Sequence, residues 1–74
     1  MSRKVSIVIE HDSHGFYAYA PELPGCHTQG RTLDEVVTRV KEAIELYLET
    51  LTDHERDALS SKEILTTTVE VRVA

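Results

Sequence analysis

The sequence predicts an α+β fold in which three strands, one helix and a fourth strand form a single domain over residues 1–74. Three observations support this order. Apolar residues recur every three or four positions over 33–51, the period of one helical face. Apolar and polar residues alternate over 4–11 and over 64–73, the pattern of strands with one buried face. Short runs of Gly, Pro, Asp and Ser separate these segments and mark turns.

The helix is expected from Leu33 to Leu51, without an internal Gly or Pro. Thr32 is placed to cap it, and Glu35 lies three residues later, the spacing of a capping box. Acidic residues in the first turn suit the helix dipole. The stripe that must be buried consists of Leu33, Val36, Val37, Val40, Ala43, Ile44, Tyr47, Leu48 and Leu51.

The first two strands are expected at 4–11 and 16–20, joined by the turn-forming stretch 12–15 into a hairpin. In the second strand the small alanines allow close packing of the helix. Tyr17 and Tyr19 then lie on the opposite face. The apolar face of the first strand consists of Val5, Ile7 and Ile9.

Pro21–Gly25 is a loop of fixed shape, because two prolines and a glycine cannot lie inside a paired strand. A short third strand over 26–29 follows and leads through Gly30 into the helix. After the helix, the polar stretch 52–62 is expected to be a connection, with a short helical turn near 55–59.

The fourth strand, 64–73, is expected beside the first strand and parallel to it, since a crossover through a helix is almost always right-handed. The sheet order would be 3-2-1-4. The helix, about 28 Å long at 1.5 Å per residue, would cover one face of this four-stranded sheet.

The other face of the sheet is left open, because one helix covers only one side. An open antiparallel face is compatible with water, and Tyr is also favoured at protein interfaces. A chain this short buries only about 60% of its unfolded surface, which favours self-association as a homodimer or homotetramer. The open face would carry Ser6, Val8, Tyr17, Tyr19, His27, Thr68, Glu70 and Arg72.

Composition excludes several classes of function. The net charge of −5 argues against direct nucleic-acid binding and suits a basic partner, although an acidic pI is also ordinary for a cytosolic protein. Cys26 is the single cysteine, so no internal disulfide forms, and with no secretory signal a cytoplasmic location is expected. No apolar run is long enough to span a membrane.

Three linked blocks resemble the HicB family of antitoxins over almost the whole chain. They are Gly15-Phe-Tyr-Ala-Tyr-Ala followed by Pro21-Glu-Leu-Pro-Gly-Cys, then Gly30-Arg-Thr, and then the helix ending Glu42-Ala-Ile-Glu-Leu-Tyr-Leu. The resemblance implies a truncated, RNase-H-like β-β-β-α-β unit. It also implies that the chain neutralises a HicA-type toxin, a small basic RNA-cleaving protein, by covering the toxin and its active-site histidine.

The sequence departs from the family pattern in two ways. Glu22 stands where Asp is more usual. The chain ends at Ala74, so the C-terminal DNA-binding segment through which many family members repress their own operon is not expected. Short solitary members of the family also occur without an evident toxin, which leaves the toxin partner open.

No catalytic, cofactor or metal site is expected. The histidines lack a compact ligand spacing, and Cys26 and His27 are neighbours on a strand that point to opposite faces. Cys26 is expected to pack under the helix. A two-metal nuclease needs converging carboxylates, whereas Glu10 and Glu70, if they meet, are accompanied by Arg72. We therefore do not expect an enzyme.

Two functions remain. The first is a HicB-like antitoxin that binds a HicA-like toxin through Glu10, Tyr17, Tyr19 and Glu22. The second is a homo-oligomeric regulatory or ligand-binding module without a toxin, in which the tyrosine face pairs with itself.

Overall fold

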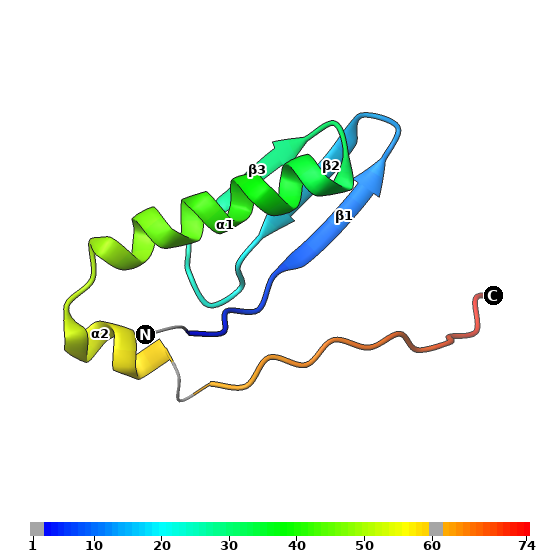
Figure 1. The fold of residues 1–74 in the computed structure, drawn as a ribbon. Helices are drawn as coiled ribbons and strands as arrows, with labels where there is room; N and C mark the ends of the chain where they lie inside the picture. Colours follow the sequence, from blue (N-terminus) through cyan, green and yellow to red (C-terminus); the bar gives the residue numbers. More distant parts are fainter. Residues whose placement is uncertain (1–2, 60–61) are drawn as a thin grey trace.

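The computed structural model describes residues 3–59 and 62–74 and has an α+β fold. Three strands form one antiparallel sheet in the order β1-β2-β3, and α1 lies across one face of it (Figure 1). A second helix follows α1. The elements are β1 (Val8–Asp12), β2 (Gly15–Tyr19), β3 (His27–Gly30), α1 (Leu33–Glu49) and α2 (Asp53–Leu59).

The strand register determines which residues share a face of the sheet. Ile9 lies opposite Ala18, and Ala18 is fully buried, so this pair belongs to the face beneath α1. Val8 lies opposite Tyr19 and Glu10 lies opposite Tyr17 on the other face. The prediction that both tyrosines point away from the helix is therefore confirmed.

The core lies between α1 and the sheet, and α1 packs against β2 and β3. The helix buries one residue per turn from the predicted stripe. Cys26 is also buried in this cluster, as expected. The buried residues are Ala18, Ala20, Leu23, Cys26, Val36, Val40 and Ile44.

The entry into α1 is fixed by a close approach and a cap. A Cβ on Gly30 would lie 2.9 Å from the backbone nitrogen of Val36, so only glycine fits between β3 and the helix. The Thr32 hydroxyl accepts a hydrogen bond from the Glu35 N–H at 3.1 Å, as predicted. The Glu35 carboxylate reaches back to the N–H of Arg31 at 3.4 Å.

The end of α1 and the start of α2 follow each other directly. α1 ends at Glu49, two residues before the predicted end, and Thr50 forms its C-cap by donating its hydroxyl to the Tyr47 carbonyl at 2.7 Å. Thr52 and Glu55 then form a complete capping box, with bonds of 2.9 and 3.1 Å. The predicted connection with a helical turn is thus a second helix.

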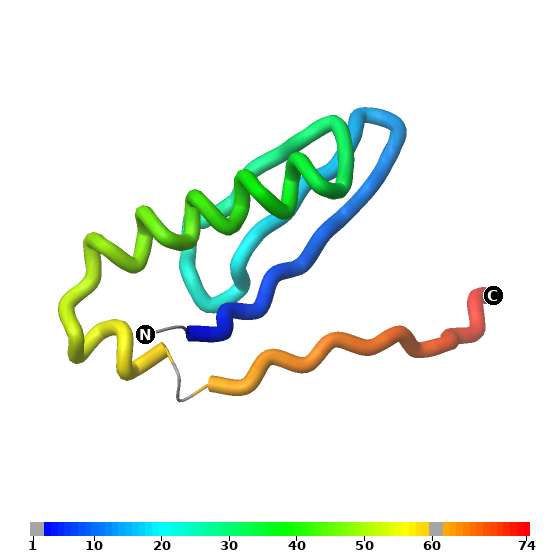
Figure 2. Tube along the Cα trace, in the orientation of Figure 1, coloured from blue at the N-terminus to red at the C-terminus, as the bar shows by residue number. Residues whose placement is uncertain are grey.

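The prediction of a fourth strand at 64–73 is wrong. The segment 62–74 is extended but has no strand pairing, and it leaves the body of the molecule as a separate arm (Figure 2). The Cα radius of gyration is 14.5 Å, against about 11 Å for a compact chain of this length. The order 3-2-1-4, the parallel pairing and the single helix are therefore not observed.

The physical reason is that the predicted helical turn is a longer helix, α2, which redirects the chain before the last segment begins. Ile64 is half-buried and lines a pocket with Val5 and Ser6, but every residue after Ile64 is exposed. Alternation of apolar residues indicates which side of a strand is apolar and does not indicate its partner. The fourth strand of the expected RNase-H-like unit is consequently missing from the described part of the chain.

Candidate interaction surface

The outer face of the sheet brings together three of the four residues predicted to contact a partner. Glu10 and Tyr17 face each other across β1 and β2. The ring centroids of Tyr17 and Tyr19 are 5.8 Å apart, and Tyr17 lies 5.7 Å from the His27 ring on β3. These side chains form a continuous aromatic surface, which we call the tyrosine face: Val8, Glu10, Tyr17, Tyr19, His27 and Gln29.

The tyrosine face has the chemistry of a binding surface. Tyr17 is 38% exposed although it lies in the central strand, because no second layer covers this side of the sheet. Tyrosine contributes a large, rigid contact area together with a hydroxyl that forms hydrogen bonds. Glu10 adds a negative charge at the side of the rings and favours a basic partner.

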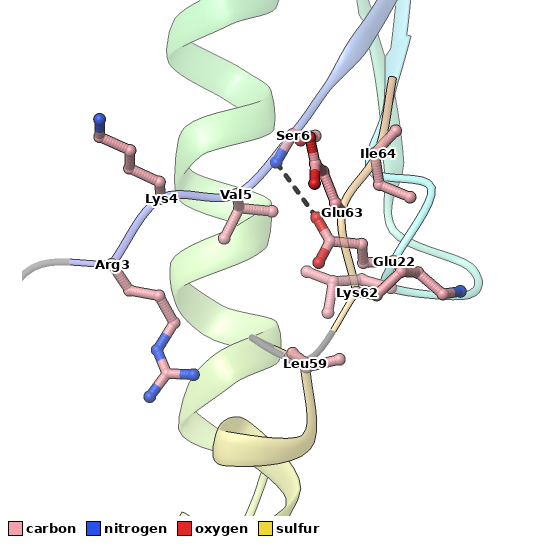
Figure 3. Close-up of a pocket in the computed structure, with 10 residues that line it drawn as sticks. Arg3, Lys4, Val5, Ser6, Glu22, Leu59, Lys62, Glu63 and Ile64 are labelled. Carbon is pink, nitrogen blue, oxygen red and sulfur yellow. Dashed lines mark hydrogen bonds between the residues drawn. The ribbon is translucent and has the colours of Figure 1, made fainter. Parts of the chain in front are cut away.

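Glu22 lies apart from the tyrosine face. Its carboxylate accepts a hydrogen bond from the Ser6 N–H at 3.4 Å and lines a pocket of about 400 Å³ (Figure 3). Ser6 precedes Glu10 by four residues, about 13 Å along an extended chain. The same pocket is also lined by Arg3, Lys62 and Ile64. The N-terminal stretch and the start of the segment 62–74 therefore meet there.

The arrangement expected for a nuclease is not present in the described residues. Glu70 and Arg72 are exposed in the segment 62–74 and do not extend the sheet beside Glu10. Ser6 lies before β1, and Thr68 is exposed in the same unpaired segment. Within residues 3–59 and 62–74, no cluster of three or more His, Cys, Asp or Glu side chains could hold a metal ion.

Cys26 and His27 are separated by the sheet, as predicted. Cys26 is buried in the core and His27 is exposed on the outer face. Burial raises the pKa of the Cys26 thiol above its ordinary value. The thiol is thus protonated at neutral pH, and the neighbouring His27 lies on the other face of the sheet.

Sequence reasoning missed a groove between the N-terminal stretch and the helices. Its volume is about 1120 Å³, and it exists because α1 covers β2 and β3 and leaves the side of β1 open. Its apolar residues come from the predicted first strand and the predicted helix. The groove was not predicted, because a fourth strand was expected to cover these residues. The apolar lining is Val5, Ile7, Val37, Val40, Ile44 and Leu48.

The lining of this groove also includes charged side chains. Glu45, Glu49 and Asp53 contribute acidic groups, and Lys41 and Arg56 contribute basic ones. Arg56 is held in place through hydrogen bonds to the Leu48 carbonyl and to Asp53, each 2.9 Å long. The groove therefore combines apolar and charged side chains, as protein-binding surfaces do.

Comparison with known proteins identifies the family. A family model described as "HicB_like antitoxin of bacterial toxin-antitoxin system" matches residues 5–71. The chain belongs to the HicB-like antitoxin family. The resemblance seen in the sequence is thereby confirmed.

Relatives of this HicB-like chain occur in bacteria and archaea. A UPF0150 protein of Helicobacter pylori is 40% identical over 70 residues, which cover 95% of this chain and 97% of the relative. One from Archaeoglobus fulgidus is 64% identical over 47 residues, covering 62% and 68% of the two chains. One from Thermoplasma acidophilum is 44% identical over 52 residues, covering 69% and 75%.

The family's proline-rich motif has a structural role in this HicB-like chain. Within the loop after β2, Leu23 is only 1% exposed and inserts into the core. The Ala20 N–H donates to the Cys26 carbonyl at 3.0 Å and closes the loop, and Gly25 has a φ of 82°. The motif thus positions the start of β3.

No helix in residues 3–59 or 62–74 is long and apolar enough to cross a membrane.

Proposed function

We propose that this chain is a non-enzymatic antitoxin that neutralises a small, basic, HicA-type RNA-cleaving toxin by binding and covering it. The observation that carries the proposal is the family match over residues 5–71, a range that contains the whole tyrosine face. A cytoplasmic location accompanies this function, because the toxin's substrate is messenger RNA.

The proposed contact surface has its centre at Tyr17 and Tyr19. The planes of the two rings are tilted by 39° to each other, and together the rings offer a partner one aromatic surface. Glu10 lies beside them, and the net charge of −5 attracts a basic toxin over longer distances. Glu22 extends the contact only if the partner also reaches the end of the sheet near Ser6.

The function is tested with the product of the neighbouring open reading frame. Co-expression of the two proteins is expected to yield a complex and to rescue growth from the toxicity of the partner. Tyr17→Ala combined with Tyr19→Ala is expected to weaken the complex by at least about tenfold, since aromatic residues dominate such interfaces. Absence of a small basic partner, or rescue that this double variant leaves unchanged, would contradict the proposal.

A matched control separates contact from folding. Tyr47 lies on α1 and is half-buried against the core, so Tyr47→Phe removes one hydroxyl away from the tyrosine face. This variant is expected to bind as the unchanged chain does. Weakening by Glu10→Gln that disappears at high salt would identify Glu10 as an electrostatic contact.

A second function, a homo-oligomeric regulatory or ligand-binding module without a toxin, is favoured by a different observation. The segment 62–74 exposes Leu65, Val69, Val71 and Val73, each more than 70% exposed, on an arm outside the core. Such apolar exposure is typical of an association surface. Self-association as a homodimer or homotetramer is compatible with toxin binding, and sedimentation of the isolated chain at micromolar concentration tests it.

A further inference from the structure

The chain contains two matching features that are both without a partner in the described structure. The first is the outer edge of β1, which borders no other strand in the sheet β1-β2-β3. The second is the segment 65–73, an extended stretch in which Val69, Val71 and Val73 alternate with polar residues. An open strand edge pairs readily with an extended segment.

The groove lies next to this edge and fits the apolar side of such a strand. Val5 and Ile7 form one side of the groove, and Val37 forms part of the other and is 40% exposed. Ile9, in β1 itself, is 36% exposed on the helix-facing side of the sheet. A strand added to β1 with its valines turned toward α1 would cover these side chains.

The position of Ile64 limits how much of the segment can pair with β1 of its own chain. Ile64 lines the pocket formed with Val5 and Ser6, so a strand that continued from there along β1 would advance by about 3.3 Å per residue on both chains. With Ile64 beside Val5, Val71 would then reach Asp12, the last residue of β1, and Val73 would lie beside His14 in the hairpin turn. A segment from another molecule is free of this anchor and can place all three valines over the groove.

We propose that the segment 65–73 of each copy binds the β1 edge and the groove of a second copy, in a reciprocal strand exchange. Each chain has one donor segment and one sheet edge beside the groove, that of β1, so two copies satisfy each other and the assembly closes as a two-fold dimer. This inference deepens the homo-oligomeric function above and rests on it, but it assigns the interface to the arm and not to the tyrosine face.

Electrostatics distinguishes this interface from the one with a toxin. Two copies of a chain with net charge −5 repel each other, so apolar contacts and main-chain hydrogen bonds must hold the dimer. Added salt screens the repulsion and is expected to strengthen the dimer. Binding of a basic toxin is expected to weaken under the same change.

The test uses the full-length chain with one variant in each half of the interface. Val71→Glu changes the donor segment and Val37→Glu changes the acceptor groove. In analytical ultracentrifugation each variant alone is expected to dimerise at least about tenfold more weakly than the unchanged chain. An equimolar mixture is expected to regain association, because one of its two junctions joins an unaltered segment to an unaltered groove.

Two further variants introduce the same charge at side chains that the proposed dimer does not turn into the groove. Thr68→Glu lies on the polar side of the segment, and Thr38→Glu lies on α1 outside the groove lining. Both are expected to dimerise nearly as the unchanged chain does. Circular dichroism checks that all four variants retain the helices, which is expected because the altered side chains are exposed.

Several outcomes would overturn the exchange. A chain that stays monomeric at millimolar concentration removes both the exchange and the homo-oligomeric function. A dimer that resists Val71→Glu and Val37→Glu but dissociates in Tyr17→Ala keeps the homo-oligomer and refutes the exchange. An equimolar mixture that associates no more tightly than either variant alone also refutes the exchange.

Discussion

The body of the molecule and its C-terminal arm show the same kind of apolar alternation, yet only the alternating segment in the body is paired in the sheet. Ile9 in β1 finds Ala18 across a hairpin whose strands are separated by two residues. Val71 in the arm finds no partner within the described chain. The comparison shows that alternation secures a strand only when a partner is close in sequence or supplied by another molecule.

The largest expected difference between the two regions concerns their leucines. Leu23→Ala empties a site that is 1% exposed and is expected to lower the free energy of unfolding by about 2–5 kcal/mol. Leu65→Ala alters a side chain that is 82% exposed. In dilute protein it is expected to change the free energy of unfolding by less than about 0.5 kcal/mol. Urea denaturation measures both, and equal losses would erase the distinction between body and arm.

A smaller loss is expected where β3 meets α1. Gly30→Ala places a Cβ 2.9 Å from the Val36 nitrogen and is expected to cost about 1–3 kcal/mol by overpacking. Gly25 is the matched control, because a Cβ there meets no atom within 4 Å and only its φ of 82° opposes a side chain.

Asparagine separates these two causes of destabilisation. Asn tolerates the left-handed conformation, so Gly25→Asn is expected to recover much of the stability lost in Gly25→Ala. Gly30→Asn is expected to recover none, since the clash with Val36 persists. Recovery at Gly30 in thermal or urea unfolding would show that the close approach of helix and strand is not the constraint.

The smallest expected effect is a pH response at the start of α2. Hydrogen bonds from the backbone N–H of Thr52, and then from its side chain, hold the pKa of the Glu55 carboxyl below its ordinary value of 4.5. A lowered pKa means that the stabilisation is present above the ordinary value and is lost as the pH falls through the folded value.

NMR titration of the Glu55 carboxyl measures this effect. Thr52→Ala removes the hydroxyl and keeps the backbone N–H, so it is expected to move the pKa of Glu55 only part of the way toward 4.5. It is expected to leave α1 unchanged, because Thr32 and Glu35 cap that helix independently. A titration of Glu55 that Thr52→Ala does not move would show that the Thr52 hydroxyl does not contribute to the lowered pKa.

The features that could be predicted from the sequence are those with a strong local signal. The stripe on α1 repeats with helical spacing, and Val36, Val40 and Ile44 are indeed buried. Tyr17 and Tyr19 follow from strand alternation once Ala18 and Ala20 are placed under the helix. Most of the tyrosine face was therefore predictable.

The features that were missed lack such a signal or compete with a stronger one. Leu23 stands alone between two prolines, so no periodicity marks it as a core residue. α2 was underestimated although Thr52 and Glu55 repeat the spacing of Thr32 and Glu35, the one local signal that would have found it. Once α2 turns the chain, the fourth strand and the groove cannot be placed from sequence alone.

The most direct test of the contrast between body and arm is hydrogen–deuterium exchange of the full chain at low nanomolar and at high micromolar concentration. The account predicts that the amides of β1 paired with β2 are protected at both concentrations. Those of residues 65–73, together with the outward amides of β1, are expected to gain protection only at the high concentration. Protection of the arm that is equal at both concentrations, or absent at both, would contradict the account.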